Sequence, residues 1–176
     1  MTVNLPKHAR VVIIGGGIVG CSTAYHLAHL GWKDIVVLER KSLASGTTWA
    51  AAGLVTQLRQ NRQMSNLVKY ATQLYACLEA ETGVATGYVT TGAIAICRTQ
   101  ARRQEWLRAS AMARSFGIDV HEIPLKVAQD LAPGLSREGL LAAFYIPEDG
   151  QTNPEDTTQS LAKGARLKGV QIFENT

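Results

Sequence analysis

The sequence predicts an α/β protein in which a parallel βαβ unit opens the chain and a segment of different character interrupts it. An apolar run at residues 10–14 leads into a glycine-rich turn and a helix of small residues, and a second apolar strand follows at 35–38. Strands and helices in a different arrangement come next, and a helix and a strand return over residues 153–173. This order is typical of a parallel-sheet domain that contains an inserted α+β segment.

The turn after the first strand has the pattern Gly15-x-Gly17-x-x-Gly20. Gly15 permits a tight turn, Gly17 lets the backbone approach a pyrophosphate, and Gly20 allows close packing of helix and strand. The start of the helix presents unpaired N–H groups and a positive dipole end to phosphates. Glu39 ends the second strand, where a carboxylate can accept hydrogen bonds from ribose hydroxyls. We therefore predict a Rossmann-type dinucleotide site rather than a turn without a ligand.

The elements that follow the turn are predicted from the spacing of apolar residues and from the glycines that end helices. The first helix is expected over residues 18–30, because Gly31 is well suited to the position after a helix end. Residues 41–63 have no clear period and predict a functional loop with a short helical piece. Apolar residues three and four apart predict an amphipathic helix over 64–81, which closes before Gly83.

The later part of the chain is expected to mix strands and helices. One strand is predicted from Val89 to Cys97, and further elements at 100–116 (helix), 118–123 (strand), 124–131 (helix) and 140–146 (strand). Arginines on the helix at 100–116 indicate a solvated face, with a basic groove as the alternative. Asn153 is the expected N-cap of a helix that has Pro154 in its first turn and runs to Lys168; a strand begins at Val170.

Composition narrows the class of protein. Hydrophobic residues make up 46%, and 18 basic against 14 acidic residues give a net charge of +4, which is far below a nucleic-acid-binding signature. Three scattered cysteines without metal-ligand spacing indicate a reducing compartment and no metal site. The segment Met1–Lys7 is too short and polar for a signal peptide, and no apolar run reaches the length of a membrane span. We therefore predict a cytoplasmic protein with neither nucleic-acid nor membrane partners.

Two stretches are more specific than the glycine pattern. Residues 36–40 and the loop 45–55, with Thr48-Trp49 and Ala51-Ala52-Gly53, resemble the dimethylglycine/sarcosine dehydrogenase family, flavin-dependent amine dehydrogenases and oxidases similar to D-amino-acid oxidase. Segments 83–92, 117–120 and 149–154 are also similar, so the resemblance covers almost the whole chain.

The resemblance implies FAD as the cofactor. Glu39 would bind the adenosine ribose with Arg40 near the adenine, and residues 46–54 would run along the pyrophosphate and ribityl chain, where Gly53 leaves room for the flavin ring. The candidate cofactor-binding residues are Gly15, Gly17, Ile18, Val19, Gly20, Glu39, Arg40, Ser45, Gly46, Thr47, Thr48, Trp49, Ala50, Ala51, Ala52, Gly53 and Leu54.

One position departs from the family pattern. In many members the residue after the tryptophan is a histidine attached to the flavin, whereas this chain has Ala50. Alanine has no nucleophilic nitrogen, so we expect non-covalent FAD binding and a lower flavin reduction potential than in covalently linked relatives.

The resemblance also implies a function and a domain plan. The leading hypothesis is the N-terminal FAD-binding part of an oxidoreductase that takes a hydride from an N-methyl amine such as sarcosine or dimethylglycine, with folate bound by a downstream domain. The segments would be 1–82 (FAD-binding), 83–147 (start of the inserted α+β substrate domain) and 148–176 (return to the FAD-binding domain). We expect an incomplete N-terminal portion; 176 residues alone would bind flavin weakly or not at all and could be inactive.

Two other functions remain open at this point. One is a non-catalytic regulatory subunit of the same fold, such as that of pyruvate dehydrogenase phosphatase. The other is an NAD-dependent Rossmann protein, against which the Glu39-Arg40 context and the long Ser/Gly/Thr loop argue.

The remaining reactive side chains do not form a recognisable catalytic group. His26 and His29 lie three residues apart without a third ligand, so packing or surface roles are favoured over a metal site. Cys21 is interpreted as a small packing residue. Glu148 and Asp149 have no identifiable acid–base partner, so the catalytic residues are unknown.

Overall fold

The computed structural model describes residues 5–59 and 61–176. Met1–Asn4, in the polar segment weighed above as a signal peptide, and Gln60, in the predicted loop, lie outside the described residues. The described chain forms two compact units. The first comprises the residues up to Leu54 with Gln73–Tyr88 and Thr152–Thr176, and the second comprises Val55–Thr72 and Val89–Gln151. The division into FAD-binding segments (1–82 and 148–176) and a substrate-domain segment (83–147) stays a prediction.

The first unit contains a parallel three-stranded sheet. Its strands are β1 (Val11–Ile14), β2 (Ile35–Leu38) and β9 (Gln171–Phe173), in the order β1–β2–β9. β1 and β9 both pair with β2 in the parallel direction. The late return of a helix and a strand to the first sheet, predicted from the sequence, is therefore confirmed.

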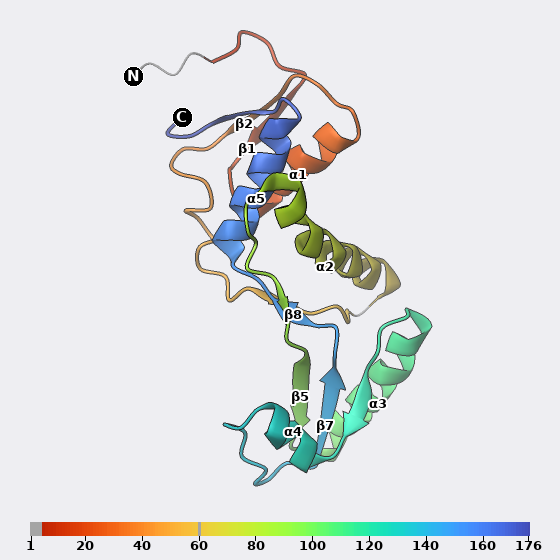
Figure 1. Cartoon of the computed structure of the whole chain (residues 1–176). Helices are drawn as coiled ribbons and strands as arrows, with labels where there is room; N and C mark the ends of the chain where they lie inside the picture. The colour runs from red at the N-terminus through yellow and green to blue at the C-terminus, as the bar shows by residue number, and fades with distance from the viewer. Residues whose placement is uncertain (1–4, 60) are drawn as a thin grey trace. The chain divides into compact units, whose positions relative to one another are not determined.

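Three helices contribute to the first unit: α1 (Ile18–His29), α5 (Pro154–Leu167) and the C-terminal part of α2 (Arg62–Thr82). α1 and α5 lie side by side (Figure 1). Gly164 permits this approach, because a Cβ there would lie 2.7 Å from the Tyr25 ring. The Asn153 side chain accepts the N–H groups of Glu155 and Asp156, as predicted for an N-cap.

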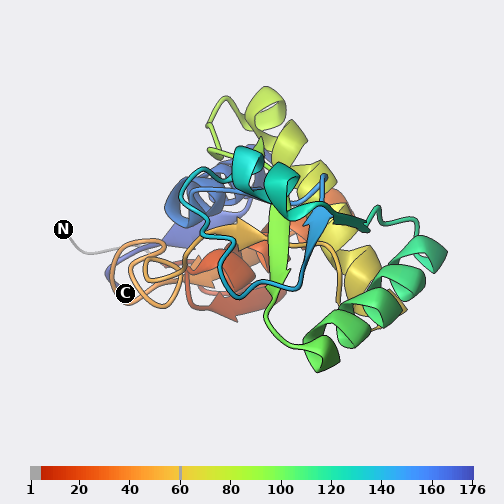
Figure 2. The same ribbon diagram turned by 90° about the horizontal axis from the view of Figure 1, so that it is seen from below.

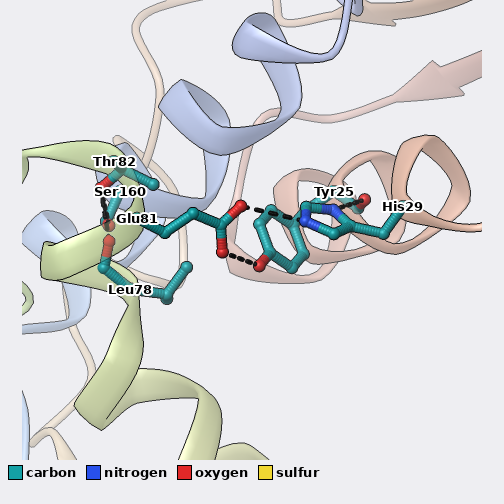
Figure 3. A network of polar contacts seen from close by, with 6 residues as sticks. All are labelled: Tyr25, His29, Leu78, Glu81, Thr82 and Ser160. Carbon is teal, nitrogen blue, oxygen red and sulfur yellow. Dashed lines mark hydrogen bonds and ion pairs between the residues drawn. The ribbon is translucent and has the colours of Figure 1, made fainter.

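Polar contacts join the end of α2 to these two helices (Figure 3). Glu81 accepts a hydrogen bond from the Tyr25 hydroxyl at 2.5 Å and contacts His29 Nε2 at 3.0 Å. The hydroxyls of Thr82 and Ser160 are 2.8 Å apart, and both residues are buried. α2 is thereby fixed to the Rossmann-type unit by side chains as well as by the buried Leu78.

The second unit is built on an antiparallel sheet in the order β5–β7–β6. Figure 2 shows β5 (Ala93–Cys97, green) beside β7 (Ala142–Ile146, blue). The other elements are β6 (His121–Ile123), α3 (Gln100–Ser115), α4 (Leu125–Leu131), β8 (Gly150–Gln151) and β4 (Val89–Thr90). β8 and β4 belong to a small sheet with β3 (Leu54–Val55), the strand in which the chain passes from the first unit to the second. Phe144 is fully buried in its core, with Trp106 stacked on it at 5.8 Å between ring centroids.

The prediction of one continuous strand from Val89 to Cys97 is wrong. The segment forms β4 and β5 in two different sheets, separated at Gly92. Gly92 has a φ of +69° and donates its N–H to Asp149 O at 2.8 Å. A residue in the left-handed conformation turns the chain out of the strand direction. The apolar residues on both sides of Gly92 therefore predicted one strand where there are two.

Two smaller expectations also require correction. The short helical piece expected in the loop is a run of turns over residues 43–50 and not a regular helix. Trp49, Ala50 and Ala51 each donate their N–H to the carbonyl three residues earlier, at 3.2 Å. The strand expected over 118–123 is limited to β6, although Ile118 and Val120 are buried before it.

Candidate functional site

The glycine turn after β1 has the geometry expected of a phosphate loop. Gly15 has a φ of +107°, a conformation that favours glycine, and donates its N–H to Leu38 O at 2.8 Å. A Cβ at Gly20 would lie 1.9 Å from Gly15 O, so only glycine lets α1 begin this close to the turn. The predicted structural roles of both glycines are therefore confirmed.

The start of α1 can receive an anion. Gly17 is the N-cap, and there is no acidic residue in the first turn. The N–H of Ile18 donates to Thr48 Oγ1 at 3.0 Å, and the first bond within the helix is Cys21 N–H to Gly17 O at 3.0 Å. The N–H groups of Val19 and Gly20 precede that bond and are available, with the helix dipole, to a phosphate.

Glu39 lies at the end of β2 and contacts the glycine turn directly. Its Oε2 accepts the N–H of Gly16 at 2.7 Å, and its Oε1 accepts the N–H of Lys41 at 2.8 Å. The hydrogen bond from Gly16 makes the larger contribution and that from Lys41 the next, and together they hold the pKa of Glu39 below its usual value. The carboxylate is therefore ionised at neutral pH, and each oxygen keeps acceptor capacity for a ribose hydroxyl.

A cavity of about 590 Å³ joins the glycine turn, the end of β2 and the following loop. Twelve of the predicted cofactor-binding residues line it: Gly15, Gly17, Ile18, Val19, Gly20, Glu39, Arg40, Ser45, Gly46, Thr47, Thr48 and Ala51. The structure thus brings together three segments that the sequence analysis had assigned to one ligand.

Five of the predicted residues do not line this cavity: Trp49, Ala50, Ala52, Gly53 and Leu54. Trp49 and Leu54 are both 71% exposed. Gly53 has a φ of +76°, and a Cβ there would lie 2.1 Å from Thr152 O. Glycine is therefore required at this position by the neighbouring backbone, and its role beside a flavin ring stays a prediction.

Four residues that line the cavity were missed from the sequence: Ile13, Ile14, Thr23 and Lys41. Thr23 lies one helical turn after Val19 and donates to its carbonyl at 2.8 Å, so the i, i+4 spacing was an available signal. Lys41 directly follows the predicted Glu39-Arg40 pair and adds a second cationic side chain.

These residues fit the phosphate and ribose part of a dinucleotide. A Cβ at Gly17 would lie 3.1 Å from Thr48 Oγ1, so a side chain there would have to displace the Thr48 hydroxyl by a few tenths of an ångström. Main-chain N–H groups, hydroxyls of the loop and two basic side chains supply donors for anionic oxygens, and Glu39 supplies an acceptor for hydroxyls.

The second unit contains a buried polar group and a separate groove. Asp149 is 2% exposed, and its Oδ1 accepts the N–H of Gln57 at 2.8 Å. Burial raises the pKa of Asp149 above its usual value, against the opposing effects of the Gln57 N–H and Arg59. A groove of about 760 Å³ lies between the start of α2 and α3, and its lining includes Arg59, Glu105 and Arg108.

His26, His29 and Cys21 each have close neighbours within the first unit. No group of three or more metal-ligating side chains is found in the part of the chain that the structure describes. His29 contacts Glu81 instead, and His26 Nδ1 lies 2.6 Å from Ser22 O. Cys21 is fully buried, and burial raises the pKa of its thiol to about 12, which makes it a packing residue and a poor nucleophile.

Comparisons with known proteins agree with this geometry. The family model described as "FAD dependent oxidoreductase" (DAO) matches residues 10–176. The chain is 40% identical to the mitochondrial pyruvate dehydrogenase phosphatase regulatory subunit of Mus musculus, over 99% of this chain and 20% of that protein. It is 39% identical to the mitochondrial sarcosine dehydrogenase of Mus musculus, over 97% of this chain and 19% of that protein.

A solved structure gives the same result for the fold. L-proline dehydrogenase from P. horikoshii superposes with a TM-score of 0.90 at 26% identity, over 97% of this chain and 45% of that chain. Measured against the two curated relatives named above, the regulatory subunit and sarcosine dehydrogenase, the chain spans about a fifth of their length. No helix of the described residues is long and apolar enough to cross a membrane.

Proposed function

The chain belongs to the FAD-dependent oxidoreductase family, and from this premise we propose that it forms the FAD-binding part of an enzyme that oxidises N-methyl amines such as sarcosine or dimethylglycine. The observation that carries the proposal is the single cavity shared by the glycine turn, Glu39 and the loop at 45–51. The similarity to sarcosine dehydrogenase supports the class of substrate. Membership of this family also argues against the NAD-dependent alternative.

Each part of the cavity has a defined task. The turn at Gly15–Gly17 and the first turn of α1 bind the pyrophosphate, and Glu39 binds the adenosine ribose. Thr48 holds the loop against the start of α1. When bound, the flavin supplies the acceptor for the substrate's hydride, and the protein supplies binding and orientation.

The proposal is tested on the whole enzyme of which the chain would form the FAD-binding part. The purified enzyme is loaded with FAD and titrated anaerobically with sarcosine or dimethylglycine. We expect flavin absorbance after gel filtration and its bleaching by one of the two amines. A protein that retains no flavin would contradict the cofactor assignment. Bound flavin that neither amine reduces would contradict the amine substrate while leaving the cofactor assignment intact.

A regulatory subunit without turnover is the second candidate function. It is favoured by the 40% identity to the pyruvate dehydrogenase phosphatase regulatory subunit and by Ala50 at the position where many relatives carry the flavin-linking histidine. The same titration separates the two, since a regulatory subunit would hold flavin that amines do not reduce.

Three further expectations belong to this proposal. FAD is held non-covalently because Ala50 lacks a nucleophilic nitrogen. Folate is the proposed partner of a further domain, and nucleic acid and membranes are not partners. The cytoplasmic location is retained as a proposal although two relatives are named as mitochondrial; a tagged protein that fractionates with mitochondria would contradict it.

A further inference from the structure

Glu174 lies outside the cavity but contacts the segment that leads into its loop. Its Oε2 accepts the main-chain N–H of Leu43 at 2.8 Å. Its Oε1 lies 3.6 Å from an Arg166 guanidinium nitrogen, on α5. One carboxylate therefore joins the strand end after β9, the last turns of α5 and the start of the loop.

The residues at the start of the loop are held against the glycine turn. Leu43 and Ala44 are 3% and 2% exposed, and Ala44 donates its N–H to Gly16 O at 3.0 Å. Ala44 has a φ of +62°, a left-handed conformation that is strained for a residue with a Cβ. Such a conformation persists only where the neighbouring contacts enforce it.

The backbone keeps Glu174 in place. Glu39 donates its N–H to Phe173 O at 2.8 Å, and Thr176 donates to Glu39 O at 2.9 Å. Asn175 donates to Lys41 O at 2.9 Å. The segment after β9 thus runs alongside residues 39–41, and the carboxylate of Glu174 reaches the next main-chain N–H of the loop.

We propose that Glu174 is a positioning residue of the flavin site: its carboxylate anchors Leu43, and through Ala44 the loop is held on the phosphate turn. The proposal rests on the proposed function, because the ligand it serves is FAD. Glu174 does not line the cavity, so its effect on binding passes through the loop. The hydrogen bond to Leu43, and not the ion pair with Arg166, carries this effect, since the pair is 35–39% exposed and screened by solvent.

Four variants separate the hydrogen bond from the charge. Glu174→Gln keeps the side-chain length and an acceptor, Glu174→Asp keeps the charge but shortens the reach, and Glu174→Ala removes both. Glu79→Ala, on the exposed surface of α2, is the matched control. The dissociation constant for FAD is measured by fluorescence titration, and loop release by the rate of trypsin cleavage after Arg40 and Lys41 without FAD.

We expect Glu174→Ala and Glu174→Asp to bind FAD roughly 3- to 30-fold more weakly and to be cleaved faster, as befits a lost charge-assisted hydrogen bond. Glu174→Gln should retain most of the affinity, and Glu79→Ala should match the wild type. Wild-type affinity in Glu174→Asp, or a larger loss in Glu174→Gln than in Glu174→Asp, would overturn the proposal. If Glu174→Ala does not fold, the Asp and Gln variants decide.

A failure of the proposed function can be distinguished from a failure of the role assigned to Glu174. A wild-type protein that binds no FAD contradicts the proposed function, and the cleavage rates then still test whether Glu174 holds the loop. Equal cleavage of wild type and Glu174→Asp would show that it does not.

Discussion

The carboxylate of Glu39 accepts the main-chain N–H of Gly16 at 2.7 Å, so the acid that ends β2 holds the glycine turn that follows β1. A Cβ at Gly16 would lie 2.9 Å from the Glu39 Cβ, which shows how closely these two chain segments approach. Glu39 therefore shapes the phosphate turn in addition to its predicted contact with ribose.

This contact predicts a pH dependence of stability. The hydrogen bonds from Gly16 and Lys41 lower the pKa of Glu39 in the folded state, so the folded protein favours the ionised carboxylate. The stabilisation is present above the pKa of an unfolded glutamate and is lost as pH falls through the lower folded pKa. Glu39→Gln should flatten the decline of the urea unfolding midpoint in the acid range. Glu79→Gln is the control and should decline like the wild type. If the unfolding midpoint of Glu39→Gln fell as steeply with pH as in these two proteins, the prediction would be refuted.

Gly20 should tolerate no side chain. The Cβ of Gly20→Ala would lie 1.9 Å from the main-chain oxygen of Gly15, so either the strand or the helix must move. We expect a loss of about 2–4 kcal/mol in the free energy of unfolding, in line with severe overpacking. Gly46→Ala is the control, because nothing lies within 4 Å of its added Cβ. Chemical denaturation of both variants gives the comparison, and equal stabilities would be inconsistent with this prediction.

The Thr48 hydroxyl should stabilise the start of α1. It accepts the N–H of Ile18 at 3.0 Å and is 8% exposed, so it acts as a cap supplied from a distant loop. Thr48→Val removes the acceptor at nearly constant volume and should cost about 0.5–2 kcal/mol of unfolding free energy. Thr48→Ser retains the hydroxyl and should lose less. If Ser proved as destabilising as Val in a thermal melt, the hydroxyl would not be the cause.

The flavin should separate from the polypeptide on denaturation. Ala50 provides no nitrogen for a bond to the flavin, and it lies outside the cavity that the phosphate-binding residues line. After acid precipitation of the FAD-loaded protein, we expect the flavin in the supernatant and a colourless pellet. Flavin fluorescence that stayed with the washed pellet would demonstrate a covalent link at another residue.

Local rules explain why much of the fold could be predicted. Some features depend only on residues a few positions apart, so a short stretch of sequence predicts them. Examples are the N-cap at Asn153, the helix end at Gly31 and the glycine turn. The strand prediction failed at Gly92 for the opposite reason. Gly92 combines a positive φ with a hydrogen bond to Asp149 O, a partner that lies 57 residues later in the chain (149 − 92).

By itself the sequence determined the βαβ unit, its phosphate turn and the acid at the end of the second strand, because period, caps and glycine spacing act within short stretches. Only the tertiary structure decided which side chains support that turn. Glu39, Thr48 and Glu174 bind main-chain N–H groups 23, 30 and 131 residues away. Such hydrogen bonds need a distance and a direction that arise only when the sheet has brought the segments together, and no local pattern in the chain records them.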